Sequence, residues 1–72
     1  MGGMNVLVVG GGGREHALCL GLDRSTSVES IHCSPGNAGT SQIATNHQVS
    51  ASDITGLLSL VKELGIDLVV TG

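Results

Sequence analysis

An apolar run that stops at four consecutive glycines is the feature that most constrains this chain. Residues 5–9 read Asn-Val-Leu-Val-Val, and residues 10–13 are all glycine. Continuous apolarity over a short run is typical of a parallel strand covered on both faces. Residues 14–22 are rich in helix-forming side chains and predict a helix. A strand that enters a helix through glycines predicts an α/β fold, and its exposed N–H groups can bind an anion such as phosphate.

The middle of the chain predicts a second strand and a second loop. Residues 28–33 alternate loosely between apolar and polar side chains, as a strand does. Residues 34–40 contain Pro, Gly and Asn, which break regular structure and predict a loop. At most a short strand is expected near Gln48–Val49. Gly21, inside the first helix, predicts either a weak point or a close approach to the sheet.

The last third of the chain predicts a helix and another buried strand. Ser50, Ser52 and Asp53 are candidate caps, and Gly65 stands where a helix-ending glycine belongs. Between them, one apolar stripe is formed by Ile54, Leu57, Leu58, Val61 and Leu64. The full order of strand, helix, strand, loop, helix, strand predicts a parallel sheet with right-handed crossovers, which is a partial Rossmann-like domain.

Composition excludes several classes of function. The formal net charge is −3, and the three basic residues, Arg14, Arg24 and Lys62, are scattered, so no basic stripe exists for a nucleic acid. No apolar run approaches the ~18 residues of a membrane helix, and the first residues lack the features of a signal peptide. Residues 1–3 are interpreted as a cloning remnant or an alternative start. We expect no nucleic-acid or membrane partner.

The absence of Phe, Tyr and Trp leaves the core to aliphatic side chains. This predicts that packing partners are supplied by other parts of a longer protein. Cys19 and Cys33 form neither a Cys-x-x-Cys pair nor a disulfide framework, so they are expected to be buried small hydrophobic residues in a reducing cytoplasm.

Both glycine-rich loops follow strands, and ligands of open parallel sheets bind beyond the carboxyl ends of the strands. Gly10 and Gly11 are expected to form the turn. The expected substrate-binding residues are Gly12, Gly13, Arg14, Glu15, Pro35, Gly36, Asn37 and Gly39. No catalytic nucleophile and no metal-ligand cluster are predicted.

Several of these side chains have two interpretations. Arg14 either contacts substrate or is a solvated first-turn side chain. Glu15 either interacts with the helix dipole or bonds ribose hydroxyls or the reacting amine. Asn37 either makes the turn or contacts substrate. His16 either orients its neighbours or is structural, and His32 and His47 are expected to be structural.

A dinucleotide is the obvious phosphate compound, but the fingerprint fails. If the pattern Gly-x-Gly-x-x-Gly begins at Gly10, Glu15 occupies its third glycine position. If the pattern begins at Gly11, His16 occupies that position. The second strand also lacks a terminal acid for the ribose, because Glu29 comes too early. The Gly-x-x-x-x-Gly-Lys-Ser/Thr phosphate loop is absent, since the only lysine is Lys62.

The two loops together resemble those of glycinamide ribonucleotide synthetases (phosphoribosylamine–glycine ligases). Residues 10–18 read GGGGREHAL and residues 35–40 read PGNAGT, and their spacing and the ending at residues 67–72 also fit. The resemblance covers the chain from Met4 onward. It implies that residues 4–72 are a truncated amino-terminal pre-ATP-grasp domain, without the ATP-grasp region.

The resemblance further implies the activity. These enzymes join glycine to 5-phosphoribosylamine in purine biosynthesis, splitting ATP to ADP and phosphate with magnesium through a glycyl phosphate. ATP, magnesium and glycine would be held mostly by regions outside this chain, which alone is expected to be inactive. Two alternatives remain: a non-enzymatic nucleotide-binding module, and another ATP-grasp enzyme such as a carboxylase, which the Arg14-Glu15-His16 triplet disfavours.

Overall fold

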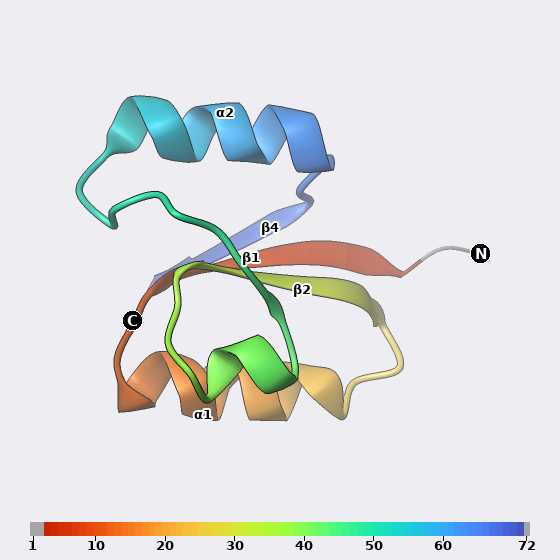
Figure 1. The fold of residues 1–72 in the computed structure, drawn as a ribbon. Helices are drawn as coiled ribbons and strands as arrows, with labels where there is room; N and C mark the ends of the chain where they lie inside the picture. Colours follow the sequence, from red (N-terminus) through yellow and green to blue (C-terminus); the bar gives the residue numbers. More distant parts are fainter. Residues whose placement is uncertain (1–2, 72) are drawn as a thin grey trace.

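The computed structural model describes residues 3–71, and it has the predicted α/β architecture (Figure 1). The predicted order of strands and helices is confirmed, with a single 3-10 turn and one short strand added. In chain order the elements are β1 Met4–Gly10, α1 Gly13–Asp23, β2 Val28–Pro35, η1 Thr40–Gln42, β3 Thr45–Asn46, α2 Ile54–Leu64 and β4 Leu68–Thr71.

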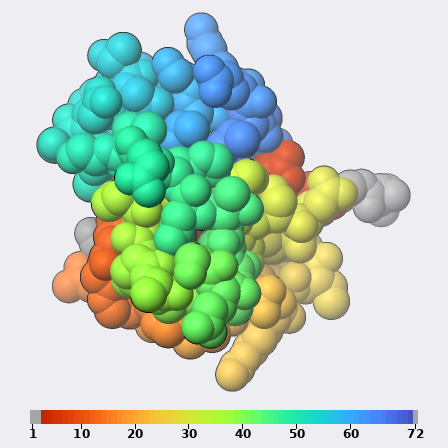
Figure 2. Space-filling view, viewed as in Figure 1, coloured from red at the N-terminus to blue at the C-terminus, as the bar shows by residue number. Residues whose placement is uncertain are grey.

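The four strands form one parallel sheet in the order β3-β2-β1-β4. Helix α2 covers one face of this sheet, whereas α1 and η1 cover the other (Figure 1). In the same orientation, the green segment between β2 and α2 lies across the front of the molecule (Figure 2). Because all strands are parallel, their carboxyl ends meet at one edge, where the two glycine-rich loops begin.

Strand β1 is the centre of the structure because both of its faces are covered. Val6, Leu7 and Val8 have no exposed surface, which explains the unbroken apolar run. Val6 and Val8 belong to a cluster with Cys19 of α1 and with Ile31 and Cys33 of β2. Both cysteines are free and fully buried, so their predicted role as small hydrophobic residues is confirmed.

The predicted ends of α2 are confirmed. The carboxylate of Asp53 accepts a hydrogen bond from Gly56 N at 3.0 Å and caps the helix. Gly65 has a φ of +63° and its N–H donates to the carbonyl of Val61, as a left-handed helix-ending residue does.

One expectation about local structure was wrong, and one of the two alternatives for Gly21 is excluded. The short strand is Thr45–Asn46, which pairs with His32 and Cys33, and not Gln48–Val49. Past this point the buried Ser34 hydroxyl lies 3.2 Å from His47 O and 2.6 Å from Val49 O, so a side chain replaces the strand ladder. A Cβ on Gly21 would meet nothing within 4 Å, so that glycine makes no close approach to the sheet.

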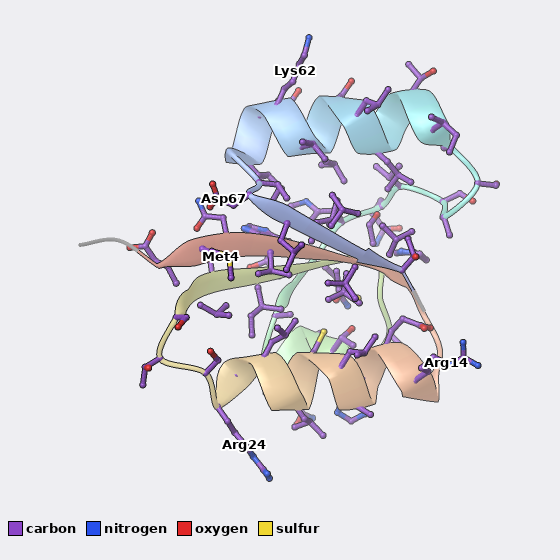
Figure 3. All side chains as sticks on the ribbon, turned by 180° about the vertical axis from the view of Figure 1, so that it is seen from behind. Met4, Arg14, Arg24, Lys62 and Asp67 are labelled. Atoms are coloured by element: carbon purple, nitrogen blue, oxygen red, sulfur yellow. The ribbon has the colours of Figure 1, made fainter. Side chains whose placement is uncertain are left out.

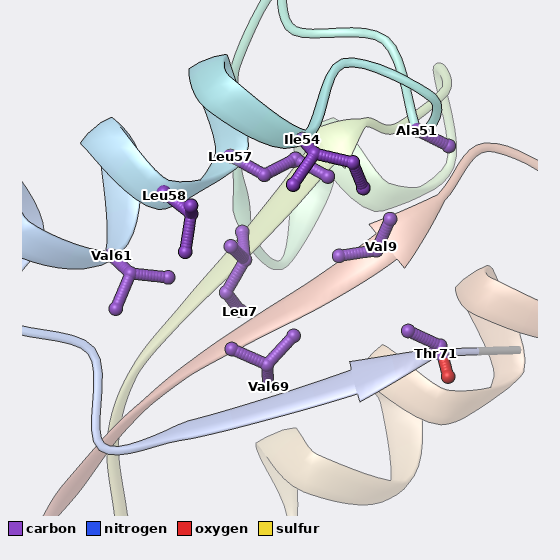
Figure 4. Close-up of a pocket in the computed structure, with 9 residues that line it drawn as sticks. All are labelled: Leu7, Val9, Ala51, Ile54, Leu57, Leu58, Val61, Val69 and Thr71. Atoms are coloured by element: carbon purple, nitrogen blue, oxygen red, sulfur yellow. The ribbon is translucent and has the colours of Figure 1, made fainter.

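The apolar stripe of α2 lies on the sheet but is only partly covered. All of its residues except Leu64 line a groove of about 260 Å³ (Figure 4), together with Leu7, Val9, Ala51, Val69 and Thr71. Ile54 and Leu58 remain 64% and 60% exposed. Within residues 3–71, neither helix has the length and apolarity that crossing a membrane requires. The expectations for residues 1–2 and for Gly72 lie outside the described residues.

Candidate functional site

The first loop leaves three backbone amides open at the start of α1. Helix α1 begins at Gly13, and its first intrahelical bond runs from His16 N to Gly12 O at 3.1 Å. Within residues 3–71, the N–H groups of Gly13, Arg14 and Glu15 have no acceptor. These amides and the helix dipole give this end of α1 a partial positive charge that suits an anion.

The side chain of Glu15 occupies part of the same loop. Its Oε1 accepts a hydrogen bond from Gly12 N at 2.7 Å, which caps the helix. Gly10 has a φ of +136°, and a Cβ there would lie 2.6 Å from Glu15 Cδ. Glycine is therefore required at position 10 for two reasons. It adopts the positive φ, and it leaves room for the side chain of Glu15.

The second loop is held by a network of short polar side chains. Asn37 N donates to Thr40 Oγ1 at 2.8 Å, and Thr40 N donates to Asn37 Oδ1 at 2.9 Å. Asn46 of β3 donates from Nδ2 to Asn37 O at 2.8 Å, and its Oδ1 lies 2.8 Å from Thr40 Oγ1. Thr40 is fully buried, so this network fixes the loop from beneath.

The two loops are bonded to each other. Gly10 is the register partner of Pro35, and Gly36 N donates to Gly10 O at 3.0 Å. Asn37 Nδ2 lies 2.9 Å from Gly11 O and 3.2 Å from Gly12 O. A Cβ on Gly11 would lie 2.8 Å from Gly36 O, so the close approach of the backbones requires glycine there.

His16 packs directly on the second loop. A Cβ on Gly39 would lie 2.6 Å from the imidazole atoms Cε1 and Nδ1 of His16. The ring of His16 therefore covers the backbone at Gly39 and adds a packing contact between α1 and the second loop. All the expected site residues thus lie on two adjoining loops and the first turn of one helix.

Arg14 and Gly13 form the outer side of this site. Arg14 is exposed, and its guanidinium points away from the ribbon (Figure 3). A Cβ on Gly13 would meet nothing within 4 Å, so the space over this residue is open. Thr71 of β4 is the register partner of Val9, which places the end of β4 beside the first loop.

Sequence reasoning missed the roles of Asn46, Thr40 and Asp67. Asn46 and Thr40 hold the second loop, but a lone Asn after a strand and a loop Thr give no signal of a network. Asp67, expected to be a surface charge at strand entry, accepts a hydrogen bond from Asn5 N at 2.8 Å. It lies near Met4, at the amino end of β1 (Figure 3).

The pKa of a cysteine near the site is shifted. The pKa of Cys19 is raised to about 11, first by burial, then by neighbouring Cys33, with the charge of Glu15 also contributing. Cys33 donates its thiol hydrogen to Gly10 O at 3.5 Å. No three His, Cys, Asp or Glu side chains within residues 3–71 come together as metal ligands.

Residues 4–72 match the family described as phosphoribosylglycinamide synthetase, N domain. The chain belongs to this family. It is 51% identical to phosphoribosylamine–glycine ligase of Streptomyces coelicolor over 69 residues, which are 96% of this chain and 17% of the relative. The identities to the ligases of Mycobacterium tuberculosis and Caldanaerobacter subterraneus are 45% and 46%, each over 96% of this chain and 16% of the relative.

Membership of the synthetase N-domain family confirms the resemblance seen in the two loops. The chain spans about one sixth of the length of the ligases that it matches. The two loops and the start of α1 lie within the part of the chain that matches these ligases.

Proposed function

We propose that this chain is the substrate-phosphate-binding part of a phosphoribosylamine–glycine ligase. The reaction would join glycine to 5-phosphoribosylamine, with ATP split to ADP and phosphate, to give glycinamide ribonucleotide in purine biosynthesis. The support is family membership together with relatives that bear the ligase name. Two buried free cysteines suit a reducing cytoplasm as the place of action.

One observation supports the placement of the substrate phosphate at the start of α1. The open amides of Gly13, Arg14 and Glu15 lie at a helix start, beside a loop that Asn37 ties to the second loop. Backbone N–H groups at a helix start are common ligands of phosphate. Since these donors are fixed before ligand arrives, little ordering would accompany binding.

The side chains around the amides have separate proposed roles. Arg14 can turn toward a bound phosphate, where its planar guanidinium can donate two parallel hydrogen bonds. Gly12, whose N–H is already bonded to Glu15 in this structure, would contribute to the phosphate site if that carboxylate turned toward a ribose hydroxyl or the amine. Pro35, Gly36 and Gly39 form the opposing wall. Asn37 acts through the loop backbones, because its carboxamide is already bonded within the loops.

ATP and magnesium are assigned to the parts of the ligase outside this chain. Residues 3–71 bring no three candidate ligands together, and the side chain of Lys62 points away from the molecule. In the proposed reaction these residues therefore bind and orient the phosphoribosylamine. Such positioning can supply several kcal/mol of the rate enhancement.

Substitution at Gly13 tests the proposal in the intact ligase. Gly13→Val places a side chain in open space over the amides and meets no atom of the chain within 4 Å at its Cβ. We expect KM for 5-phosphoribosylamine to rise by roughly tenfold or more, equal to about 1.4 kcal/mol, with KM for ATP and glycine nearly unchanged.

Gly21→Val is the matched control. Gly21 also lies in α1, and a Cβ there likewise meets nothing within 4 Å, but it is a helical turn or more from the loop. It should leave every KM unchanged. Equal rises in KM for ATP and for phosphoribosylamine in a folded Gly13→Val protein would contradict a dedicated phosphate site.

A further inference from the structure

A chain of hydrogen bonds crosses the α2 face of the sheet, away from the glycine loops. Asn5 Nδ2 donates to Gly65 O at 3.2 Å, and Asn5 Oδ1 accepts from Ser30 Oγ at 2.8 Å. Ser30 Oγ lies 3.3 Å from His32 Nε2, and His32 Nδ1 lies 2.9 Å from His47 Nε2. These residues come from four separate parts of the sequence, so the chain joins β1, β2 and the segment after β3 to the end of α2.

The direction of each bond follows from the first. Asn5 must present its oxygen to Ser30, because its nitrogen is bonded to a carbonyl. Ser30 therefore donates its only hydrogen to Asn5 and can only accept from His32. His32 consequently carries its hydrogen on Nε2 and offers a lone pair on Nδ1, and His47 donates Nε2–H to it.

The imidazole pair holds the segment that leads from β3 to α2. His47 N also donates to Cys33 O at 2.9 Å, and the Ser34 hydroxyl lies near the carbonyls of His47 and Val49. The two rings lie 5.1 Å apart at their centroids and are tilted by 36°. The His32–His47 bond is thus a second side-chain connection, beside that of Ser34, between this segment and β2.

We propose that His32 and His47 form a proton-operated latch, closed when they share one hydrogen along the Nε2–Nδ1 bond and opened when both rings are protonated. A first added proton can occupy Nδ1 of His47 and leave the bond in place. A second must go to Nδ1 of His32, where two N–H groups would face each other. The segment from His47 to Ser50 then loses its imidazole connection to β2 and keeps only the contacts of Ser34 and the bond from His47 N to Cys33 O.

The other charged groups on this face of the sheet are bonded to other partners or exposed. Asp67 accepts from Asn5 N, Asp53 caps α2 through Gly56 N, and Lys62 points away from the sheet. Glu63 is exposed on α2. Burial and, after it, the charge of His47 lower the pKa of His32, in agreement with a His32 that resists the second proton.

Two measurements on the intact protein test the latch. Histidine-selective NMR reports the tautomer and the titration of each ring. Hydrogen exchange followed by mass spectrometry reports the opening of peptides that cover residues 44–50. We expect the Nε2–H tautomer of His32 at pH 7.5 and separate titration midpoints for the two rings, with that of His32 below the ordinary histidine value. Protection of residues 44–50, corrected for intrinsic exchange, should fall by about tenfold or more between pH 7.5 and 5.

His47→Gln is the variant that separates the latch from ordinary acid loosening. The glutamine Nε2 can donate to Nδ1 of a neutral His32, and the glutamine Oε1 can accept from Nδ1–H of a protonated His32, so the connection persists in both states. Its residues 44–50 should lose most of the pH dependence of protection. Equal pH dependence in the variant, a common midpoint for both rings, or an Nδ1–H tautomer of His32 would overturn the proposal. The NMR result on the unsubstituted protein decides if the variant does not fold.

Discussion

The side-chain nitrogen of Asn37 lies 2.9 Å from the carbonyl oxygen of Gly11, across the line between the two glycine-rich loops. The same nitrogen lies 3.2 Å from Gly12 O, while the side-chain oxygen accepts from Thr40 N. One carboxamide thus bonds the carbonyl groups of the first loop and leaves the N–H groups of Gly13, Arg14 and Glu15 open. This arrangement makes Asn37 a positioning residue for the proposed phosphate site.

Asn37→Asp should separate these two halves of the carboxamide. The carboxylate keeps an acceptor for Thr40 N but replaces the donor with an oxygen that faces two carbonyl oxygens. Loss of a donor that leaves partners unpaired costs about 1–3 kcal/mol. We expect the free energy of unfolding, measured with urea, to fall by that amount and KM for phosphoribosylamine to rise. Asn37→Ala removes the acceptor as well and should be at least as destabilising. An Asp variant as stable as the unsubstituted protein would show that the tie contributes nothing.

Gly36→Ala should destabilise the protein through the second loop. Gly36 has a φ of +75°, and a Cβ there would meet Asn46 Oδ1 and lie 2.8 Å from Thr40 Oγ1. Strain of this kind costs about 1–3 kcal/mol, and disruption of the buried Thr40 network adds to it. Gly21→Ala, in open space within α1, should instead stabilise by up to about 1 kcal/mol. Urea unfolding of both variants checks the opposite signs, and equal effects would contradict the argument.

The sequence predicts the order of elements because each signal is local. The stop of an apolar run at Gly10, the cap at Asp53 and the helix end at Gly65 depend on neighbouring residues alone. The position of β3 does not follow from such signals. Thr45 and Asn46 pair with β2. The hydroxyl of Ser34, more than ten residues earlier, bonds the carbonyls of His47 and Val49 in place of further strand pairing.

The candidate site was predictable in its location but not in its bonds. Two glycine-rich loops after parallel strands must meet at one edge, so residues from both were expected together. The bond from Gly12 to Glu15, the tie from Asn37 to Gly11 and the ring of His16 over Gly39 depend on side-chain directions. Spacing in the sequence does not determine those directions.

NAD and NADP should bind weakly. Glu15 stands at the third glycine position of the dinucleotide fingerprint counted from Gly10, and its carboxylate already holds Gly12 N–H at 2.7 Å. A pyrophosphate at the start of α1 would meet this negative charge. We expect a dissociation constant weaker than about 10 μM, or roughly −7 kcal/mol, by calorimetric titration. Tighter binding of either dinucleotide would contradict the rejection of a dinucleotide site.

Cys19 should react slowly with thiol reagents in the folded protein. Its pKa is raised to about 11 by burial, by Cys33 and by Glu15. Two pH units above an ordinary thiol lower the thiolate fraction at pH 8 by about a hundredfold, before any loss of access. Iodoacetamide labelling followed by mass spectrometry should show slow modification of Cys19 in buffer and rapid modification in urea. Labelling at the rate of a free thiol in native buffer would contradict the buried position.

Stability should decrease as the pH falls from 7 toward 5, because His32 resists protonation in the fold. Its pKa is lowered below the ordinary histidine value by burial and by His47. Between that lowered pKa and about 6.5, the unfolded chain holds more protons than the folded one, so the free energy of unfolding rises with pH. The contribution of His32 to the free energy of unfolding is complete above about pH 6.5 and is lost as the pH falls through the pKa of His32 in the folded protein.

Urea midpoints at intervals of half a pH unit measure this slope. His32→Asn, whose Oδ1 can accept from His47 without titrating, should flatten it. An equal slope in the variant, or a midpoint that rises on acidification, would assign the pH dependence to other groups.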